Sequence, residues 1–526
     1  MTLFSQHSRV WQTSLMIVVV VAVFSWLQSL PILADPDSFY HVKITIMNRD
    51  FGLLTDFPWT QNSLYKDAFI DHHFLYHVIL TPFVSLMDPL IGIKVSALLF
   101  GSLSILAIIW LLKKETAPWP WLWLIVLITN SPLLFRLSLG KAPSLAIGAI
   151  FIAWYFIIRK KYLALFFWSW FFVWFYSVWP TIIIMIGVAT IIEAIIDSYQ
   201  TIKVSGATLK NFIKLMGRNF WSHKNKMVWL AGLSGLLAGI IINPYFPTNL
   251  IYLKQLFAMS VVGYYKFVGI GAEWYPWPLV ELIEKISLPL LIWLLATLIM
   301  FFNIKKQTKL SWSSWLMTII FFVYSIKARR QVEYLVPWSV ISSAIIVRDS
   351  LKDFSIKAWW KNVHTWLPKP LQKKWCLIML AVYLAIFLPI GLAKGLLTAR
   401  DGLNNGFKLD YLQPASDWLQ KNSQNGDIVF QTDWGTFPLL FYNNTHNYYL
   451  TGLDQTFMYE YNADQYQLWV DATTGKRPDI YDVAKYDFNA KWLLLEKRHA
   501  ASLRYLNREP RAVKVYQDDE VIIYQL

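Results

Sequence analysis

The chain has 526 residues, of which 56% are hydrophobic and only 15% are charged, and its mean hydropathy is +0.40. A soluble domain carries roughly 25% charged residues, so the composition excludes an ordinary soluble protein and predicts an integral membrane protein. The net charge of +15 arises before residue 400, because residues 401–526 hold 12 Lys and Arg against 17 Asp and Glu. Basic loops on the cytoplasmic side of a membrane explain this distribution better than a nucleic-acid partner does.

Eleven apolar runs lie within the first 400 residues. A membrane helix needs roughly 17–25 residues, and the shorter runs require some local adjustment of the bilayer. Clusters of Lys and Arg between the runs set the orientation, with the N-terminus in the cytoplasm. The predicted spans are 14–33, 92–112, 120–134, 143–158, 162–179, 180–197, 228–243, 286–303, 311–326, 334–348 and 375–393.

Residues 71–89 form a further apolar segment. Counting it as a span would place Lys113 and Lys114 outside the cytoplasm, against the positive-inside rule. We therefore expect a juxtamembrane or re-entrant helix on the external face. With this topology, the loops 34–73 and 243–284 are extracytoplasmic.

Residues 400–526 have the pattern of a small α/β domain. The segment "ASDWLQKN" predicts a helix, and "GDIVFQTD", "YYLTGLD", "KWLLLEK" and "VKVYQDDEVIIYQL" predict strands. A segment of this length can bury a core of its own. We therefore divide the chain into a membrane domain, residues 1–399, and an extracytoplasmic α/β domain, residues 400–526.

Two acids directly follow the first predicted span, in "ADPDSFYHVKI". Asp35 and Asp37 are two residues apart, so in a turn stiffened by Pro36 they can converge on one cation or one acidic hydroxyl. Carboxylates at a membrane edge are costly unless they have a function. The alternative is that an Asp here only caps a juxtamembrane helix.

A lone acid, Glu273, lies in the aromatic external stretch "VGIGAEWYPWP". An acid without a basic neighbour is costly in such surroundings unless it is paired across space or binds a cation. It is otherwise a solvated loop residue. The adjacent Trp274 can stack on a sugar ring or belong to an interfacial aromatic belt.

External cations form a third group, in "SIKARRQVEYLVPW". Lys327, Arg329 and Arg330 lie where positive charge is not expected, so we predict a bound anion such as a lipid phosphate. We expect Arg329 to pair with Glu333 four residues on, which leaves Arg330 for the phosphate. The alternative is that these are snorkelling side chains. A smaller group of the same kind, Arg136 and Lys141, occurs in "LLFRLSLGKAPS".

The segment "DWGTFP" follows a predicted strand of the C-terminal domain. One acid, one indole and one glycine give it the composition of a recognition loop. It can equally be a strand-end turn in an ordinary α/β domain.

Taken together, these features resemble the GT-C superfamily of membrane glycosyltransferases, and within it the catalytic subunit of oligosaccharyltransferase. "DPDSFYHVKI" is similar to that family's D-x-Y-Y-H-x-R-like stretch, with Asp37, Tyr40 and His41 matching and Lys43 in place of the usual Arg. "DWGTFP" loosely resembles its W-W-D-Y-G motif, and Glu273 matches an external catalytic Glu. The family's second acidic motif is missing, and "LSLGKAPS" stands in its place.

The resemblance implies transfer of a sugar or oligosaccharide from a polyprenyl-phosphate donor to a glycan, lipid or protein acceptor, in a bacterial inner membrane. It implies a catalytic role for Asp37 with Asp35 and Glu273, which are also the candidate ligands of a Mg²⁺ or Mn²⁺ ion. The expected donor-phosphate ligands are Arg330, Arg329, Lys327, Arg136 and Lys141. The expected acceptor- or sugar-binding residues are His41, Tyr40, Trp274, Asp433 and Trp434.

Two other functional classes stay open for this protein. A lipid-linked-sugar transporter usually has two related halves, and the sequence shows no such symmetry. A non-catalytic assembly subunit is favoured if Asp37 and Glu273 are far apart. The sequence contains no P-loop, dinucleotide fingerprint, H-E-x-x-H or G-x-S-x-G pattern.

Overall fold

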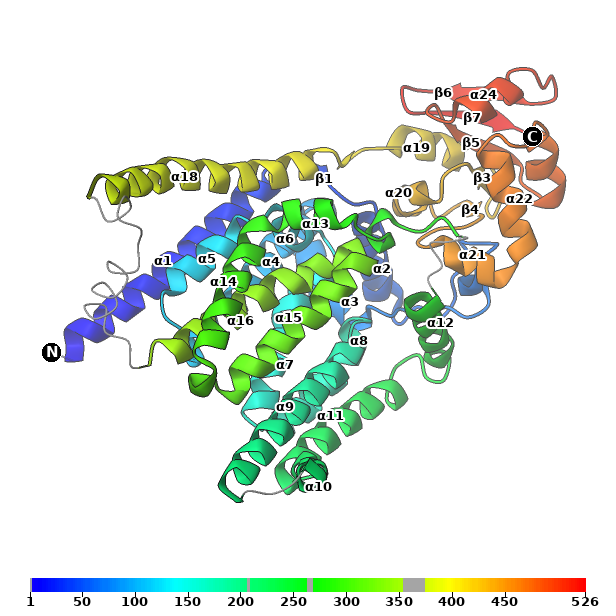
Figure 1. Ribbon diagram of the computed structural model, residues 1–526. Helices are drawn as coiled ribbons and strands as arrows, with labels where there is room; N and C mark the ends of the chain where they lie inside the picture. Colours follow the sequence, from blue (N-terminus) through cyan, green and yellow to red (C-terminus); the bar gives the residue numbers. More distant parts are fainter. Residues whose placement is uncertain (1, 206–208, 263–267, 353–373) are drawn as a thin grey trace.

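A computed structural model describes residues 2–205, 209–262, 268–352 and 374–526. Most of the chain forms a helical body, and a small α/β unit lies at one end of it (Figure 1). The helices of the body are α1 (Thr2–Gln28), α2 (Asp37–Phe51), α3 (Phe74–Leu86), α4 (Pro89–Lys114), α5 (Pro120–Ile128), α6 (Ser131–Leu137), α7 (Pro143–Ile158), α8 (Tyr162–Phe175), α9 (Pro180–Ser205), α10 (Leu209–Phe220), α11 (His223–Ile241), α12 (Asn249–Val262), α13 (Leu279–Lys285), α14 (Ser287–Phe302), α15 (Lys309–Lys327), α16 (Val332–Ser350) and α18 (Lys374–Asn404). Four 3-10 turns accompany them: η1 (Leu64–Lys66), η3 (Ala272–Trp274), η4 (Ile304–Lys306) and η5 (Arg329–Gln331).

Several of these helices can cross a membrane. Among the described residues, α1, α4, α9 and α15 are long and apolar enough, and the count rises to six if the bent pairs α5–α6 and α13–α14 are one span each. The protein is thus a multi-pass helical membrane protein, as predicted. Helices occur at all eleven predicted segments, but the number that span the bilayer stays a prediction.

The predicted span 120–134 differs from the structure. It consists of two helices, α5 and α6, bent by 76°. The break is local in origin: the Asn130 side chain accepts the Leu133 N–H at 3.1 Å and so starts a new helix. Pro132 follows in its first turn, where a missing N–H costs nothing.

The C-terminal unit contains a five-stranded mixed sheet. The strand order is β4-β3-β5-β7-β6, with β3 parallel to β4 and β5, and with β7 antiparallel to β5 and β6. This confirms the predicted helix and strands in this region. Its elements are α19 (Gln413–Asn422), β3 (Ile428–Gln431), η6 (Trp434–Thr436), α20 (Phe437–Asn443), β4 (Tyr448–Tyr449), α21 (Gln455–Tyr461), α22 (Ala463–Thr473), α23 (Ile480–Asp482), the π-helical turn η7 (Val483–Asp487), β5 (Trp492–Glu496), α24 (Ala500–Leu506), β6 (Val513–Gln517) and β7 (Val521–Gln525).

The loop 34–73 connects this unit to the helical body. Thr60 forms a parallel bridge with Tyr449 of β4, and the Trp59 indole donates to the Thr445 carbonyl oxygen at 2.9 Å. The short strands β1 (Ile32–Leu33) and β2 (Phe407–Lys408) pair antiparallel just before the aspartates. One continuous hydrophobic core therefore runs from the helices into one face of the sheet.

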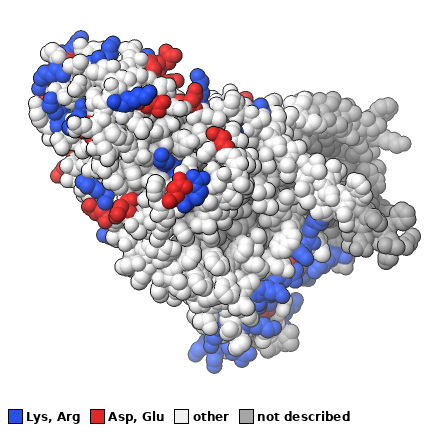
Figure 2. All heavy atoms as spheres, turned by 180° about the vertical axis from the view of Figure 1, so that it is seen from behind, with Lys and Arg blue, Asp and Glu red and all other residues white. Residues whose placement is uncertain are grey.

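Charged side chains occur mainly at the two ends of the molecule (Figure 2). The basic clusters that we assigned to the cytoplasm meet at the end opposite the sheet. There Arg159 and Arg348 both bind Glu115, and Lys160 and Lys309 share Glu193. A mostly uncharged surface separates the two ends in this view, as expected for a belt that faces lipid.

Candidate active site

Two aspartates and one lysine form the first half of the site. Asp35 lies in the turn after β1, and Asp37 is the first residue of α2. The Nζ atom of Lys141, in the loop between α6 and α7, lies 2.7 Å from Oδ2 of Asp35 and 2.7 Å from Oδ2 of Asp37. Asp35 also accepts the Asp37 N–H at Oδ1, at 2.8 Å. One ammonium group thus joins both carboxylates that the sequence singled out.

A glycine lets the lysine loop come this close to α2. A Cβ atom on Gly140 would lie 2.9 Å from the Ser38 Oγ and 2.8 Å from the Ile93 Cγ1. Atoms at such distances clash, so a larger residue would push the loop away from α2. Gly140 therefore sets the distance between Lys141 and Asp37.

A second lysine fixes the chain before the aspartates. Lys94 of α4 is 7% exposed, and its ammonium group donates to the carbonyl oxygens of Leu30 and Ile32. Buried carbonyl groups need such partners. The turn that carries Asp35 is therefore anchored to a long helix of the body.

Two arginines and two glutamates form the second half of the site. The Glu273 carboxylate accepts from Arg136 Nη1, and its Oε1 lies 3.2 Å from Arg330 Nη1. Arg136, in the last turn of α6, also donates from Nε to Glu333 Oε2 at 2.6 Å. Glu333 is completely buried. The elements α6, η3, η5 and α16 thus converge on one ionic network.

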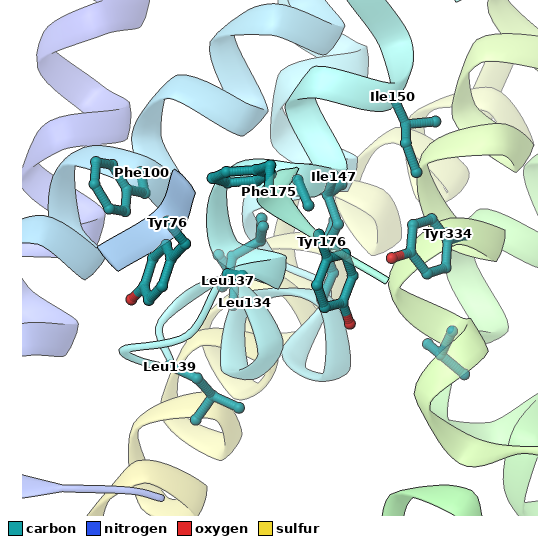
Figure 3. Close-up of a cluster of buried hydrophobic side chains, with 14 of the residues drawn as sticks. Tyr76, Phe100, Leu134, Leu137, Leu139, Ile147, Ile150, Phe175, Tyr176 and Tyr334 are labelled. Carbon is teal, nitrogen blue, oxygen red and sulfur yellow. The ribbon is translucent and has the colours of Figure 1, made fainter. Parts of the chain in front are cut away.

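Arg330 has two further contacts. Its Nη2 donates to the Tyr176 hydroxyl, and its guanidinium carbon lies 4.4 Å from the ring centroid of Trp274. Figure 3 shows the Tyr176 ring beside Leu137 and Ile147, with its hydroxyl pointing out of this buried cluster. The arginine is therefore held by a charge, a hydroxyl and an aromatic face.

Backbone hydrogen bonds join the loop around η3 to the arginine turn η5. The Arg329 N–H donates to the Tyr275 carbonyl oxygen at 3.0 Å, and the Trp277 N–H donates to the Ile326 carbonyl oxygen at 3.2 Å. These bonds fix η3 beside η5. They explain how Glu273 reaches Arg330 although more than fifty residues separate them.

The two halves act on each other electrostatically. Burial raises the pKa of Asp37 to about 6; Lys141 opposes this shift, whereas Asp35 and Glu273 add to it. Burial also disfavours ionisation of Glu273, but Arg136 and Arg330 hold its pKa below the usual range. The environment of the site thus pushes the pKa values of these two acids in opposite directions.

The predicted pair of Arg329 with Glu333 is wrong. The four-residue spacing requires a continuous α-helix, but residues 329–331 form a 3-10 turn before α16 begins. Glu333 binds Arg136 instead. Arg329 lies over the Trp277 ring, 5.0 Å from its centroid, and Lys327 is exposed at the end of α15. Their predicted binding to a donor phosphate stays a prediction.

His41 and Tyr40 lie below the surface, with 3% and 4% exposure. The His41 Nδ1 lies 2.8 Å from the His77 Nε2, and the His77 Nδ1 lies 2.6 Å from the Asp71 Oδ2. Burial lowers the pKa of His41 well below its usual value, so its ring is neutral. Contact between either residue and an acceptor stays a prediction.

The "DWGTFP" segment follows β3, as predicted. Asp433 accepts the Gly435 N–H at 2.7 Å and binds Arg498. Asp433 and Trp434 line a groove of about 730 Å³ on the C-terminal unit. Gly269, which precedes η3, also lines this groove, and its N–H donates to the Tyr466 hydroxyl at 2.9 Å.

A divalent cation is the cofactor that the resemblance implies, with Asp35, Asp37 and Glu273 as ligands. Each of these carboxylates already binds a cationic side chain. The residues present therefore do not fit a metal ion. Among the described residues, one group of three metal-binding side chains lies within 4.8 Å of one another, and it comprises Asp433, Glu496 and His499. Arg498 binds both carboxylates of that group.

Sequence reasoning missed two residues of the site. Tyr176 belongs to an apolar run, so no local pattern marks it. Asp454 accepts the Thr456 N–H at 2.8 Å at the start of α21, and the charges of Glu273 and Arg330 act on it. An acid directly before a helix is a capping signal, but it does not reveal that the helix start faces the site.

No protein-family model and no curated protein matches the sequence. Among solved structures, the oligosaccharyltransferase AglB from Archaeoglobus fulgidus, in complex with an inhibitory peptide and a dolichol-phosphate, is similar with a TM-score of 0.60 and 12% identity, over 93% of this chain and 70% of that chain. ArnT from Cupriavidus metallidurans, bound to undecaprenyl phosphate, gives 0.55 and 12% over 97% of both chains. The mycobacterial arabinofuranosyltransferase AftD gives 0.51 and 12% over 98% of this chain and 40% of that chain. These likenesses show that the chain has the GT-C fold, which confirms the resemblance found in the sequence.

Proposed function

We propose that this protein is a membrane glycosyltransferase. It moves a sugar or oligosaccharide from a polyprenyl-phosphate or polyprenyl-diphosphate donor to a glycan, lipid or protein acceptor at the extracytoplasmic face. The observation that supports this most directly is the site itself. Asp37, whose pKa burial raises to about 6, binds Lys141, and Glu273, whose charge acts on Asp37, binds Arg136 and Arg330, in a chain with the GT-C fold.

In the proposed reaction, the Asp37 carboxylate accepts the proton of the acceptor hydroxyl as its oxygen attacks the anomeric carbon. The bond between that carbon and the donor phosphate oxygen breaks, and the electron pair stays with the phosphate. Arg330 and Arg136 stabilise the negative charge of the leaving phosphate. A guanidinium group has five N–H donors, so Arg330 can bind phosphate while it keeps its contacts to Glu273 and Tyr176.

We propose a bacterial inner membrane location, with the N-terminus in the cytoplasm and residues 400–526 outside as a domain of their own. The basic end of the body supports this orientation. Because the groove beside Trp434 is open and includes part of the external loop, we place the acceptor on this side of the site.

The test is release of polyprenyl phosphate by purified protein from a panel of lipid-linked sugars, with candidate acceptors present. Wild type should release it together with a glycosylated acceptor, and Asp37→Asn should not. Release at equal rates by wild type and well-folded Asp37→Asn would remove Asp37 from the reaction.

A further inference from the structure

We propose that Lys141 takes the place of a metal ion in this site. Its ammonium group is the fixed cation that holds Asp35 and Asp37 in position, and transfer proceeds without a bound divalent cation. The inference rests on the proposed glycosyl transfer, but its main test does not require activity.

The first argument is geometric. A single nitrogen lies 2.7 Å from one oxygen of each aspartate, as a bridging cation does. The two acids are only two residues apart, and without a cation between them their charges would repel. Lys141 removes that repulsion and leaves the pair with a net charge of minus one.

The second argument is that the lysine is built into the site. Its side chain is 13% exposed, and its backbone is fixed by hydrogen bonds on both sides. The Lys141 N–H donates to the Leu139 carbonyl oxygen at 2.8 Å, and the Lys141 carbonyl oxygen accepts the Ser144 hydroxyl at 2.7 Å. The close approach at Gly140 completes this arrangement.

The third argument concerns the remaining carboxylate. Glu273 binds Arg136 and Arg330, so it offers no charge that a metal ion would need to neutralise. A divalent cation at this site would have to displace Lys141 from both aspartates. The positive charge of a cofactor is therefore already supplied by the chain.

The role we assign is positioning. An ammonium group has three N–H donors, and two are directed at the aspartates. The Asp37 oxygen that does not bind Lys141 stays available for the acceptor hydroxyl. Lys141 thereby separates the structural oxygen of Asp37 from the reactive one.

The experiment compares wild type, Lys141→Met and the exposed-lysine control Lys327→Met, each made with His499→Ala to remove the other candidate metal group. Each protein is first stripped of metal with EDTA, the EDTA is removed, and Mn²⁺ is added. Bound Mn²⁺ is then counted by electron paramagnetic resonance, and folding is checked by thermal melt. We expect no Mn²⁺ at the site in the wild-type and Lys327→Met backgrounds. We expect one Mn²⁺ per chain in Lys141→Met, lost again when Asp35→Asn is added.

Transfer activity provides the second readout. EDTA should leave the wild-type rate unchanged. Lys141→Ala should lose at least a hundredfold in rate and regain at least tenfold with added methylammonium or Mn²⁺.

Tight Mn²⁺ binding that Asp35→Asn abolishes in the chain with Lys141 intact would overturn the proposal, as would a wild-type rate that EDTA removes and Mn²⁺ restores. If no wild-type transfer is found with any donor, the proposed function fails, and the Mn²⁺ counts still decide the role of Lys141.

Discussion

Asp37 is the residue from which the reaction is expected to take its pH dependence. Burial holds its pKa at about 6, above the usual range for an aspartate, and a general base must be ionised to accept a proton. We therefore predict that kcat/KM rises about tenfold per pH unit below about 6 and levels off above it. Asp37→Asn should abolish this profile. The exposed loop acid Asp56 is the matched control, and Asp56→Asn should keep both the rate and the profile.

Arg330 tests the phosphate contact. A lysine keeps the charge but cannot reproduce a bidentate fork or the stacking on Trp274. If the contact forms fully only in the transition state, Arg330→Lys should cost about 2.7–4 kcal/mol, a hundredfold or more in rate. Arg329→Lys, which changes a side chain that lies over Trp277, should cost less than threefold. Similar losses for the two variants, with intact melting curves, would contradict the assignment.

At the scale of single residues, sequence reasoning identified the charges that stand out from their surroundings. Asp35, Asp37 and Glu273 could be identified as acids in apolar or aromatic segments. The structure places the two aspartates on Lys141 and Glu273 on two arginines, and the charge of Glu273 acts on Asp37. The pairing could not be predicted, because Arg136 crosses from another helix to reach Glu333. Tyr176 could not be predicted either, because its contact is with Arg330, which is 154 residues away in the chain.

The loop that joins α6 to α7 is the element on which the aspartate half of the site depends. Gly140→Ala would place a Cβ atom within 3 Å of Ser38 and Ile93, so the loop must shift. We predict a loss of about 1–3 kcal/mol in stability and at least a tenfold loss in transfer rate. Gly217→Ala in α10, where a Cβ atom meets nothing within 4 Å, should leave the rate unchanged and not lower the melting temperature. Thermal melts and initial rates of the two variants check this.

Whether a segment forms a helix or a strand could be predicted where its composition alone decides this. The apolar runs form helices, and the β-rich segments after residue 425 form the sheet. The break between α5 and α6 was missed because Asn130 and Pro132 were read as part of one apolar run, whereas together they start a new helix. The pairing of η3 with η5 depends on backbone hydrogen bonds between distant segments, which have no sequence signature.

At the scale of the whole molecule, the orientation in the membrane is the testable statement. Reporter fusions at Gly271 and after Leu526 should both report an extracytoplasmic location, and a fusion at Lys306 should report the cytoplasm. The physical reason is that Lys and Arg favour the cytoplasmic side of a membrane, and Arg159, Lys160 and Lys309 all lie at one end of the body. A cytoplasmic signal from both Gly271 and Leu526 would invert the topology.

The helical architecture could be predicted from hydropathy, because the length of a span constrains every apolar run alike. The orientation that the positive-inside rule gives stays a prediction. The hydrophobic core that the helices share with the sheet could not be predicted. It forms because the loop 34–73 adds Thr60 to the sheet edge at Tyr449, and neither segment has a sequence pattern that predicts this contact.

The central claim is that this GT-C fold makes a new glycosidic bond. The most direct measurement follows an isotopically labelled sugar from a polyprenyl-phosphate donor in proteoliposomes, using mass spectrometry of donor, acceptor and carrier. We predict that the label becomes covalently attached to the acceptor, that one polyprenyl phosphate appears per sugar transferred, and that Asp37→Asn stops both. Movement of the intact labelled donor across the bilayer by well-folded wild type, without any new bond across the tested donors and acceptors, would contradict the account and indicate a transporter.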